Sequence, residues 1–313
     1  MGEEYLTHSQ QDTLPTKLLL SIMSTPQIWF ITGASSGFGR AMVEHVLEKG
    51  DIAIATLRKP EVLDHLKAKY PAPKLLTLAL DVTKPSDITN AFNRAQEVFG
   101  RIDVVFNNAG YAIVGEVEGT PEETARTLFE VVFWGADRIS REAVRFFREV
   151  NKPGIGGRLL NNSSMAGLHA HPGLGYYSAA KYALEAISQS LADELDPAWN
   201  IKISLIEPGT FTTPAINENN VKVPPHPAYT NPNLEANKVR GFLDGAAAAV
   251  GGDPNKAVAR FYELAHLDQP PLRFTIGKDA IVFVRQQVER IVADIDQYES
   301  WSEGLGFSED LKV

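Results

Sequence analysis

Residues 27–39 read QIWFITGASSGFG, and this stretch decides the fold. The mostly apolar run Gln27–Thr32 is followed at once by closely spaced glycines and then by the helically patterned segment Phe38–Lys49. Glycines allow a tight turn and a close approach of the backbone to a pyrophosphate, while a helix N-terminus offers free N–H groups and a partial positive charge. The sequence therefore predicts a dinucleotide-phosphate cradle, with contacts from Gly33, Ser35, Ser36, Gly37, Phe38 and Gly39.

Outward from this unit, short apolar runs alternate with longer amphipathic segments. The further expected strands are Ile52–Leu57, Leu75–Leu80, Ile102–Phe106, Arg158–Asn162, Ile201–Ile206 and Arg273–Ile276. The expected helices between and after them are Glu61–Lys69, Ile88–Phe99, Glu122–Glu149, Tyr177–Leu195, Ala246–Leu267 and Ala280–Gln297. Near-continuous apolar strands that alternate with helices indicate a parallel sheet covered on both faces. We therefore predict an α/β fold with a doubly wound, Rossmann-like parallel sheet of about seven strands and helices on both faces.

Composition excludes several classes of protein. The chain has 313 residues, of which 44% are hydrophobic and 22% charged, so it is not intrinsically disordered. Its 39 acidic against 30 basic residues give a net charge of −9, which disfavours a nucleic-acid partner. Cys is absent, which rules out disulfides, thiolate metal sites and a cysteine nucleophile, and fits a cytoplasmic location. No apolar run approaches a membrane span and no metal-site spacing occurs, so we expect neither.

The organisation along the chain is that of one large domain with two additions. We expect residues 1–22 to form an N-terminal extension and residues 23–313 to form a single dinucleotide-binding catalytic domain. From about 210 to 240, five prolines interrupt any helix: Pro214, Pro224, Pro225, Pro227 and Pro232. This stretch follows the C-terminal end of a strand, the edge where open α/β sheets bind ligands. We therefore expect it to be a substrate lid.

The end of the second strand indicates which dinucleotide binds. An NAD site places an acidic residue there for the ribose hydroxyls. Here residues 56–59 read TLRK, with Leu57 at the expected acidic position and no carboxylate in the run. Arg58 can clamp a 2′-phosphate, with Lys59 as support. The sequence therefore predicts NADP(H).

A candidate proton-transfer pair lies further along the chain. Tyr177 and Lys181 are spaced i, i+4, which places both on one face of a helix. A neighbouring ammonium favours the phenolate and brings a tyrosine pKa of about 10 toward the working range. Ser163 and Ser164 end the fifth strand, where a hydroxyl can hydrogen-bond a substrate oxygen. A Tyr and a Lys four residues apart can equally be mere surface neighbours.

Taken together, the motifs carry a resemblance. They are the loop at 32–39, Asp81-Val82, NNAG at 107–110, Ser163-Ser164, YSAAK at 177–181, and Pro208-Gly209 with Thr213. In this order, from about Pro26 to the final helix, the chain resembles the single-domain branch of the short-chain dehydrogenase/reductase family. The TLR run and Ser36 are similar to the NADP-preferring carbonyl reductases and hydroxysteroid dehydrogenases of that family.

The resemblance implies a role for each matching residue. Tyr177 would exchange a proton with the substrate oxygen, and Lys181 would lower the pKa of Tyr177 and hold the nicotinamide ribose. The family's catalytic serine lies thirteen residues before its tyrosine, which selects Ser164. The cofactor contacts implied beyond the glycine loop, Tyr177 and Lys181 are Arg58, Asp81, Val82, Asn108, Ala109, Gly110, Pro208, Gly209 and Thr213.

One position departs from the family pattern. The family places an asparagine in the long helix, two residues before an aromatic–glycine step, and its main-chain carbonyl holds a relay water. Residues 131–135 read VVFWG, so Val132 stands there. Valine keeps the carbonyl but loses the amide that helps to distort the helix. The chain is then either a working enzyme with an altered relay or a cofactor-binding regulator with weak turnover. An epimerase or dehydratase of the extended branch is a third reading, against which the glycine spacing argues.

The substrate and partners are less defined. Phe211 and Tyr229 in the lid favour an apolar carbonyl or alcohol substrate. His169, His171 and His226 can touch a ligand or be simply solvated. In the family the long helix and the Tyr177 helix commonly form a subunit interface, so we expect a homo-oligomer.

Overall fold

The computed structural model describes residues 25–214, 219–246 and 251–305. The expected N-terminal extension, residues 1–22, lies outside the described residues. Ile28–Thr32 forms β1 and Gly37–Glu48 forms α1, so the glycine loop joins a strand directly to a helix. Among the described helices, none has the length and apolar character needed to cross a membrane.

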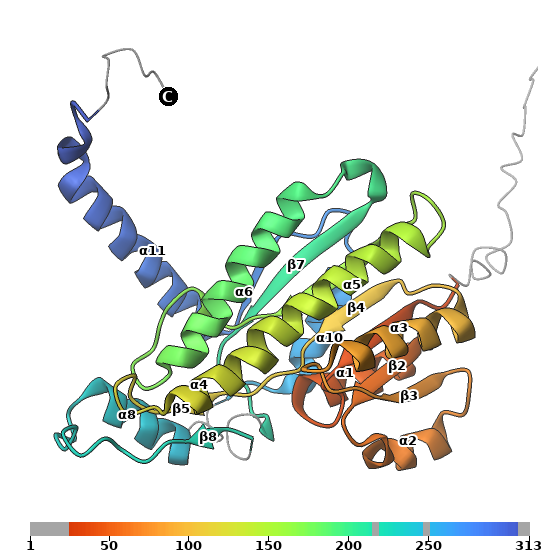
Figure 1. Cartoon of the computed structure of the whole chain (residues 1–313), viewed down its shortest axis with the longest axis horizontal. Coiled ribbons are helices and arrows are strands. Elements are labelled where there is room, and N and C mark those ends of the chain that lie inside the picture. Colours follow the sequence, from red (N-terminus) through yellow and green to blue (C-terminus); the bar gives the residue numbers. More distant parts are fainter. Residues whose placement is uncertain (1–24, 215–218, 247–250, 306–313) are drawn as a thin grey trace, which may run out of the picture.

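Seven strands form one parallel sheet in the order β3-β2-β1-β4-β6-β7-β9 (Figure 1). The bounds of the other six are β2 Ile52–Leu57, β3 Leu75–Ala79, β4 Val104–Asn107, β6 Gly157–Asn162, β7 Ile201–Pro208 and β9 Arg273–Ile276. The predicted Rossmann-like α/β fold is thus confirmed. The strand order reverses between β1 and β4, and a reversal of this kind opens a crevice at the carboxyl ends of the strands.

Helices cover both faces of the sheet. One face carries α1 and α10 (Pro254–Ala265), and the other carries α3 (Pro85–Phe99), α5 (Ala136–Glu149) and α6 (Gly175–Glu194). In β1, Trp29 stacks on Tyr262 of α10 with ring centroids 5.3 Å apart, while the next residue, Phe30, stacks on Phe92 of α3 at 4.3 Å. A strand buried on both faces needs apolar residues throughout, which explains the uninterrupted run in the sequence.

The long helix expected over residues 122–149 is present but distorted in its middle. Glu122–Phe129 forms α4, Glu130–Gly135 is wound as a π-helix, and α5 continues from Ala136. The carbonyl of Ala136 accepts hydrogen bonds from the Asn107 amide and the Ser140 hydroxyl, each at 2.8 Å. Side-chain donors therefore hydrogen-bond a backbone carbonyl at the point where the chain returns from the π-helix to a regular α-helix.

The proline-rich stretch contains more structure than its sequence predicts. Val221–Lys222 forms β8, which pairs with β5 (Ile113–Val114), and Glu235–Gly241 forms α8. This helix begins inside the predicted irregular range because the last proline is Pro232. Two further α-helices are α2 (Asp64–Lys69), which precedes β3 in the chain, and α11 (Lys278–Tyr298), which projects from the molecule (Figure 1).

Candidate active site

A cleft of about 800 Å³ opens at the carboxyl ends of the strands. Its walls come from the loops that follow β1, β2, β3, β4, β6 and β7, together with the first turns of α6. The predicted site residues that line it are Gly33, Ser35, Ser36, Gly37, Phe38, Arg58, Asp81, Val82, Asn108, Ala109, Gly110, Ser164, Tyr177, Lys181, Pro208, Gly209 and Thr213. The fold thus brings together residues that are up to 180 positions apart in the chain.

Gly39 is the predicted site residue that does not line the cleft. A Cβ at Gly39 would lie 2.2 Å from the carbonyl oxygen of Gly33, so this glycine permits the helix to pack on its own loop. Gly33 has a φ of +67°, and a Cβ there would lie 2.9 Å from the Cα of Ala109. The first turn of α1 carries no acidic side chain, so its positive end remains uncompensated beside the cleft. Bare backbone and a helix N-terminus fit a pyrophosphate.

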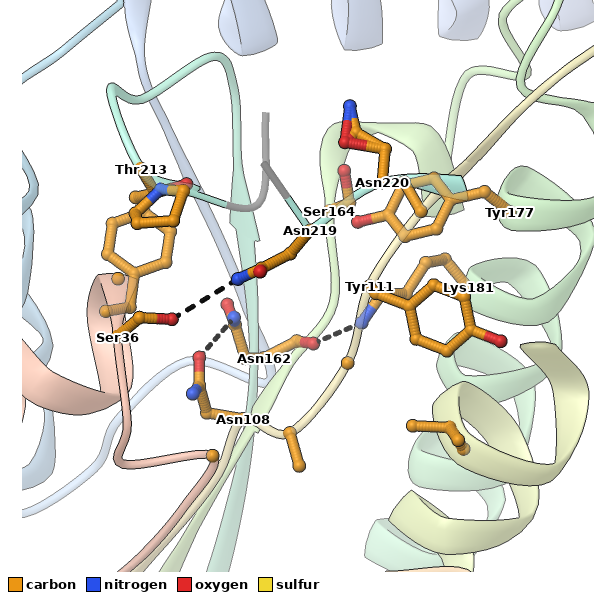
Figure 2. A pocket seen from close by; sticks show the side chains of 18 of the residues that line it. Ser36, Asn108, Tyr111, Asn162, Ser164, Tyr177, Lys181, Thr213, Asn219 and Asn220 are labelled. Atoms are coloured by element: carbon orange, nitrogen blue, oxygen red, sulfur yellow. Dashed lines mark hydrogen bonds between the residues drawn. The ribbon is translucent and has the colours of Figure 1, made fainter. Parts of the chain in front are cut away.

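Asn108 braces this loop against the end of β4. Its backbone N–H donates to the Thr32 hydroxyl at 2.8 Å, and its side-chain amide donates to the Thr32 carbonyl at 3.0 Å. Asn162, at the end of β6, donates to the Asn108 side-chain oxygen at 2.9 Å (Figure 2). One continuous set of hydrogen bonds therefore ties the glycine loop to the strand that precedes the predicted catalytic serine.

The end of the cleft formed by the loops after β2 and β3 carries two charges. Arg58 is exposed directly after β2, so its guanidinium is accessible to an anionic ligand. Burial raises the pKa of Asp81, but hydrogen bonds from Thr83 and the charges of Lys84 and Arg58 outweigh it and hold that pKa below its usual value. Asp81 is therefore an ionised acceptor at neutral pH.

The predicted proton-transfer residues converge at the other end. Figure 2 shows the Tyr177 hydroxyl beside Ser164, while the Lys181 amine points toward Asn162. Lys181 Nζ donates to the Asn162 carbonyl at 2.6 Å and lies 5.8 Å from the centroid of the Tyr177 ring. Both side chains project from the first turns of α6, as their i, i+4 spacing predicts.

Burial governs the titration of this pair. It raises the pKa of Tyr177, against a smaller lowering by the Ser164 hydrogen bond. It also lowers the pKa of Lys181 to about 8, against the opposing charge of Glu185. Burial therefore sets the direction of both shifts, while the Lys181 ammonium faces the Asn162 carbonyl and the Tyr177 ring. The lowering of the Tyr177 pKa by Lys181 stays a prediction.

The neighbouring serines have different surroundings. Ser164 lines the cleft beside Tyr177, and its hydroxyl accepts a hydrogen bond from the backbone N–H of Ala166 at 3.1 Å, whereas the Ser163 hydroxyl is buried near Glu185. Behind Ser163, Arg273 of β9 pairs with Glu185 and with Glu207, which is fully buried. Sequence reasoning missed this cluster, although Glu185 continues the Tyr177–Lys181 face by one further turn.

Val132 lies in the π-helical segment and is 1% exposed. It packs in an apolar cluster with Ile113, Leu128, Ala180 and Val223, while the preceding Val131 lines the cleft. The helix is therefore distorted at this position with a valine in place.

Further lining residues were not expected from the sequence. Most are apolar, namely Tyr111, Val114, Val131, Met165, Leu174, Val221 and Leu243, and Tyr111 and Val131 pack in the same cluster as Tyr177. From the predicted lid, Asn219 donates to the Ser36 hydroxyl at 3.4 Å, which connects the lid to the glycine loop (Figure 2). Sequence reasoning missed these lining residues because they enter the cleft only when segments far apart in the sequence pack together in the fold.

The three histidines do not line the cleft. His169 and His171 pack on Phe283 of α11, with ring centroids 5.3 and 5.1 Å away, and burial lowers the pKa of His171 to about 4. His226 contacts Tyr229 within the lid. Over the described ranges, no group of three or more His, Asp or Glu side chains is placed to hold a metal.

A doubly wound sheet with a glycine loop and a Ser-Tyr-Lys set at its switch point defines a dinucleotide-dependent oxidoreductase. The family model for short chain dehydrogenases matches residues 27–223. An uncharacterized oxidoreductase of Schizosaccharomyces pombe is 38% identical over 275 residues, covering 87% of this chain and 89% of its own. A 3-ketodihydrosphingosine reductase of Bacteroides thetaiotaomicron is 31% identical over 80% of this chain and 88% of its own.

A solved structure gives the same result. A short-chain dehydrogenase from Streptomyces avermitilis superposes with a TM-score of 0.81 at 34% identity, covering 90% of this chain and 99% of that one. The chain belongs to the short-chain dehydrogenase/reductase family, and is an oxidoreductase that uses a nicotinamide dinucleotide.

Proposed function

We propose that the protein is an NADP(H)-dependent oxidoreductase that interconverts a carbonyl and a secondary alcohol. The observation that carries this proposal is the placement of Ser164, Tyr177 and Lys181 at one end of a cleft whose other end carries the glycine loop and Arg58. Residues 23–313 would act as one catalytic domain, with residues 210–240 as its lid.

The bound nicotinamide supplies or accepts the hydride. Ser164 holds the substrate oxygen by a hydrogen bond. In reduction Tyr177 gives its hydroxyl proton to that oxygen, and in oxidation it takes the alcohol proton back. Lys181, with a pKa of about 8, is mostly charged at pH 7 and stabilises the phenolate that forms when Tyr177 gives up its proton.

The preference for NADP(H) rests on the end of β2. Leu57 is buried there, and no carboxylate follows it in the TLRK run to bind the ribose hydroxyls. Arg58 is exposed on the cleft wall, where its planar guanidinium can pair with a 2′-phosphate. These features support a resemblance to the NADP-preferring carbonyl reductases and hydroxysteroid dehydrogenases within the family.

The apolar residues of the cleft, among them Leu174, Val221 and Leu243, support a substrate with an apolar body. The amide of Asn220 lies near Ser164 and Tyr177 and would offer a polar contact beside the reacting group (Figure 2). The Bacteroides relative is named for the reduction of a 3-keto compound, in agreement with carbonyl chemistry.

The valine at position 132, where the family pattern has asparagine, supports a second candidate function, that of a cofactor-binding regulator with weak turnover. Assays of NADPH oxidation with a panel of ketones and aldehydes, and of NADP reduction with the matching alcohols, separate the two. The enzyme reading predicts saturable turnover of at least one apolar carbonyl. NADPH binding without turnover of any member would favour the regulator.

A further inference from the structure

The C-terminal helix α11 exposes an apolar face that the fold itself does not use. Of its 21 residues only Ala280 is buried, and every residue from 288 to 300 is exposed. Figure 1 shows the helix leaving the sheet after β9 and extending beyond the other helices. At 21 residues it is about 30 Å long.

The exposed apolar side chains follow a regular spacing. Ile281, Val288, Ile291, Ile295 and Tyr298, together with the half-buried Val284, succeed one another at intervals of three and four residues. The exposed Val282 and Val292 lie beside this stripe and widen it. Val288 is 55% exposed, Ile295 is 59% exposed, and Trp301, just beyond the helix, is 76% exposed. Apolar residues at alternating intervals of three and four form the seam by which two helices pair. On a helix that packs on its own globular core, such a stripe is buried, whereas on α11 it is exposed.

The face expected to form the subunit interface differs from α11. On α6 and the π-helical segment, the large exposed apolar side chains are the scattered Trp134, Tyr182 and Ile187. Along α5, Arg145 and Arg148 already pair with acidic residues of the same helix. That surface carries separate apolar side chains and ion pairs within one helix, whereas α11 carries an exposed apolar stripe along its length, so α11 is the stronger candidate for contact with another copy.

Charge along α11 is divided between its halves. Up to residue 290 it carries Lys278, Arg285 and Arg290 against Asp279 and Glu289. From 291 to 303 the charged residues are all acidic, namely Asp294, Asp296, Glu299 and Glu303. Two such helices complement each other when they run in opposite directions. An acidic end also argues against binding to a membrane surface, which favours a Lys- and Arg-rich polar face.

We propose that α11 pairs with α11 of a second copy of this chain, antiparallel about a two-fold axis. The register that overlaps the whole stripe places Val288 against Ile291 of the partner subunit and Ile281 against Tyr298 of the partner subunit. This pairing is isologous and closes as a dimer. It does not rest on the proposed chemistry.

Pairing at α11 connects to the candidate active site. Phe283 of α11 packs on His169 and His171 in the segment between Ser164 and Tyr177. Asp279 accepts a hydrogen bond from the backbone N–H of Thr210 at 2.7 Å, where the predicted lid begins. A partner that fixes α11 therefore also steadies the segment that carries the predicted catalytic residues.

The oligomeric state tests the proposal. By size-exclusion chromatography with light scattering at micromolar concentration, the wild-type chain should be a dimer and the Ile291→Lys/Ile295→Lys variant a monomer. The matched control Trp134→Lys/Ile187→Lys should remain a dimer. Circular dichroism and NADPH titration show that each variant is folded. A monomeric wild type, or an α11 variant that remains a dimer, overturns the proposal.

Disulfide cross-linking tests whether the two α11 helices run antiparallel. Because the chain has no native cysteine, any disulfide must form between introduced residues. A mixture of the Ile281→Cys and Tyr298→Cys proteins should form a disulfide-linked dimer on oxidation, while Ile281→Cys alone should not. Cross-linking of Ile281→Cys alone would show a parallel pair and contradict the register.

A wild type that is monomeric and sediments with phosphatidylserine vesicles would assign the stripe to a membrane. One that dimerises only after deletion of residues 1–24 would assign it to that segment. Either result overturns the proposal.

Discussion

At the scale of single residues, burial sets the chemistry of the cleft. Lys181 is 5% exposed, and desolvation lowers its pKa to about 8. The groups that face it are the Tyr177 ring, the Asn162 carbonyl and the carboxylate of Glu185. Because the pKa of Lys181 is about 8, the charge of Lys181 changes with pH in the physiological range, and proton transfer should change with it.

This sensitivity predicts a pH profile for carbonyl reduction. Lys181 is charged below pH 8 and loses its charge above it, so kcat should fall as the pH rises through about 8. Because Glu185 raises the pKa of Lys181, Glu185→Gln should move the break to lower pH. Steady-state kcat from pH 6 to 10 measures both. A break that moves to higher pH in this variant would contradict the assignment.

Arg58 carries the predicted cofactor preference. A charge-assisted hydrogen bond is worth about 1.5–3 kcal/mol, so Arg58→Ala should weaken NADPH binding by roughly 10- to 100-fold. NADH affinity should change little, because the lost contact is with the 2′-phosphate. Fluorescence titration of both cofactors measures this, with Lys67→Ala as control, because Lys67 is an exposed lysine of α2 that does not line the cleft. Equal affinity of the wild type for NADPH and NADH would refute the preference.

The sequence located the residues that stand in contiguous motifs, and it missed those that act across the sheet. Gly33, Arg58 and Tyr177 follow strands or open helices, so local pattern alone places them at the carboxyl edge. Asn162 is recognisable only once β4 and β6 lie side by side. Arg273 lies on β9, the last strand, and pairs with Glu185 and Glu207. These residues are far apart in the sequence, so no local sequence pattern predicts the contact.

At the scale of elements, the long helix departs most from its sequence pattern. Residues 130–135 are π-helical, although valine replaces the family's asparagine at 132. The distortion is therefore compatible with a side chain that has no amide. The backbone beyond it is satisfied by Asn107 and Ser140, two residues whose partnership no helix periodicity predicts.

Replacement of Val132 separates the contribution of its side chain to the stability of the fold from its contribution to the proton relay. Val132 is buried among apolar residues, so Val132→Asn should destabilise the fold by ~1–3 kcal/mol through burial of an amide. If valine limits the relay, we expect kcat to rise in the same variant. Urea unfolding and steady-state kinetics measure the two effects. Val132→Thr, which buries a polar group without an amide, is the control, and an unchanged kcat in Val132→Asn would remove the relay argument.

At the scale of the whole molecule, the predicted lid is fastened to the body by a buried ion pair. Glu116, 3% exposed, accepts two hydrogen bonds from Arg240 at 3.0 Å and one from the backbone N–H of His226 at 3.3 Å. Arg240 also donates to the Val223 carbonyl at 2.7 Å. Together with the Asn219–Ser36 contact, these bonds hold residues 219–240 over the cleft.

Loosening this attachment should affect substrate binding more than chemistry. Removal of one partner of a buried ion pair costs about 3–5 kcal/mol, most of it from the group left unpaired. Arg240→Met should therefore raise the KM for the carbonyl substrate and speed proteolytic cleavage within 219–240. The exposed Lys222–Asp244 pair is the control, and Lys222→Met should change neither. An Arg240→Met protein with wild-type KM and cleavage rate would show that the pair does not restrain the lid.

The layered architecture was predictable because most strands of the seven-stranded sheet read as apolar runs between helical segments, whereas the short pair β5–β8 has no such pattern. The projection of α11 was not, because an amphipathic pattern predicts a helix and an apolar face without stating what covers that face. The same helical pattern describes α10, which packs on α1, and α11, which leaves the sheet. Only the assembled fold distinguishes them.

The most direct test of the central claim is turnover of the wild type and Tyr177→Phe side by side. With NADPH and a carbonyl that the wild type reduces, Tyr177→Phe should lower kcat by ~10²–10⁴-fold, because no group then gives the proton to the substrate oxygen. The affinity of the variant for NADPH, measured by fluorescence titration, should stay close to that of the wild type. Unchanged kcat in Tyr177→Phe would contradict the account.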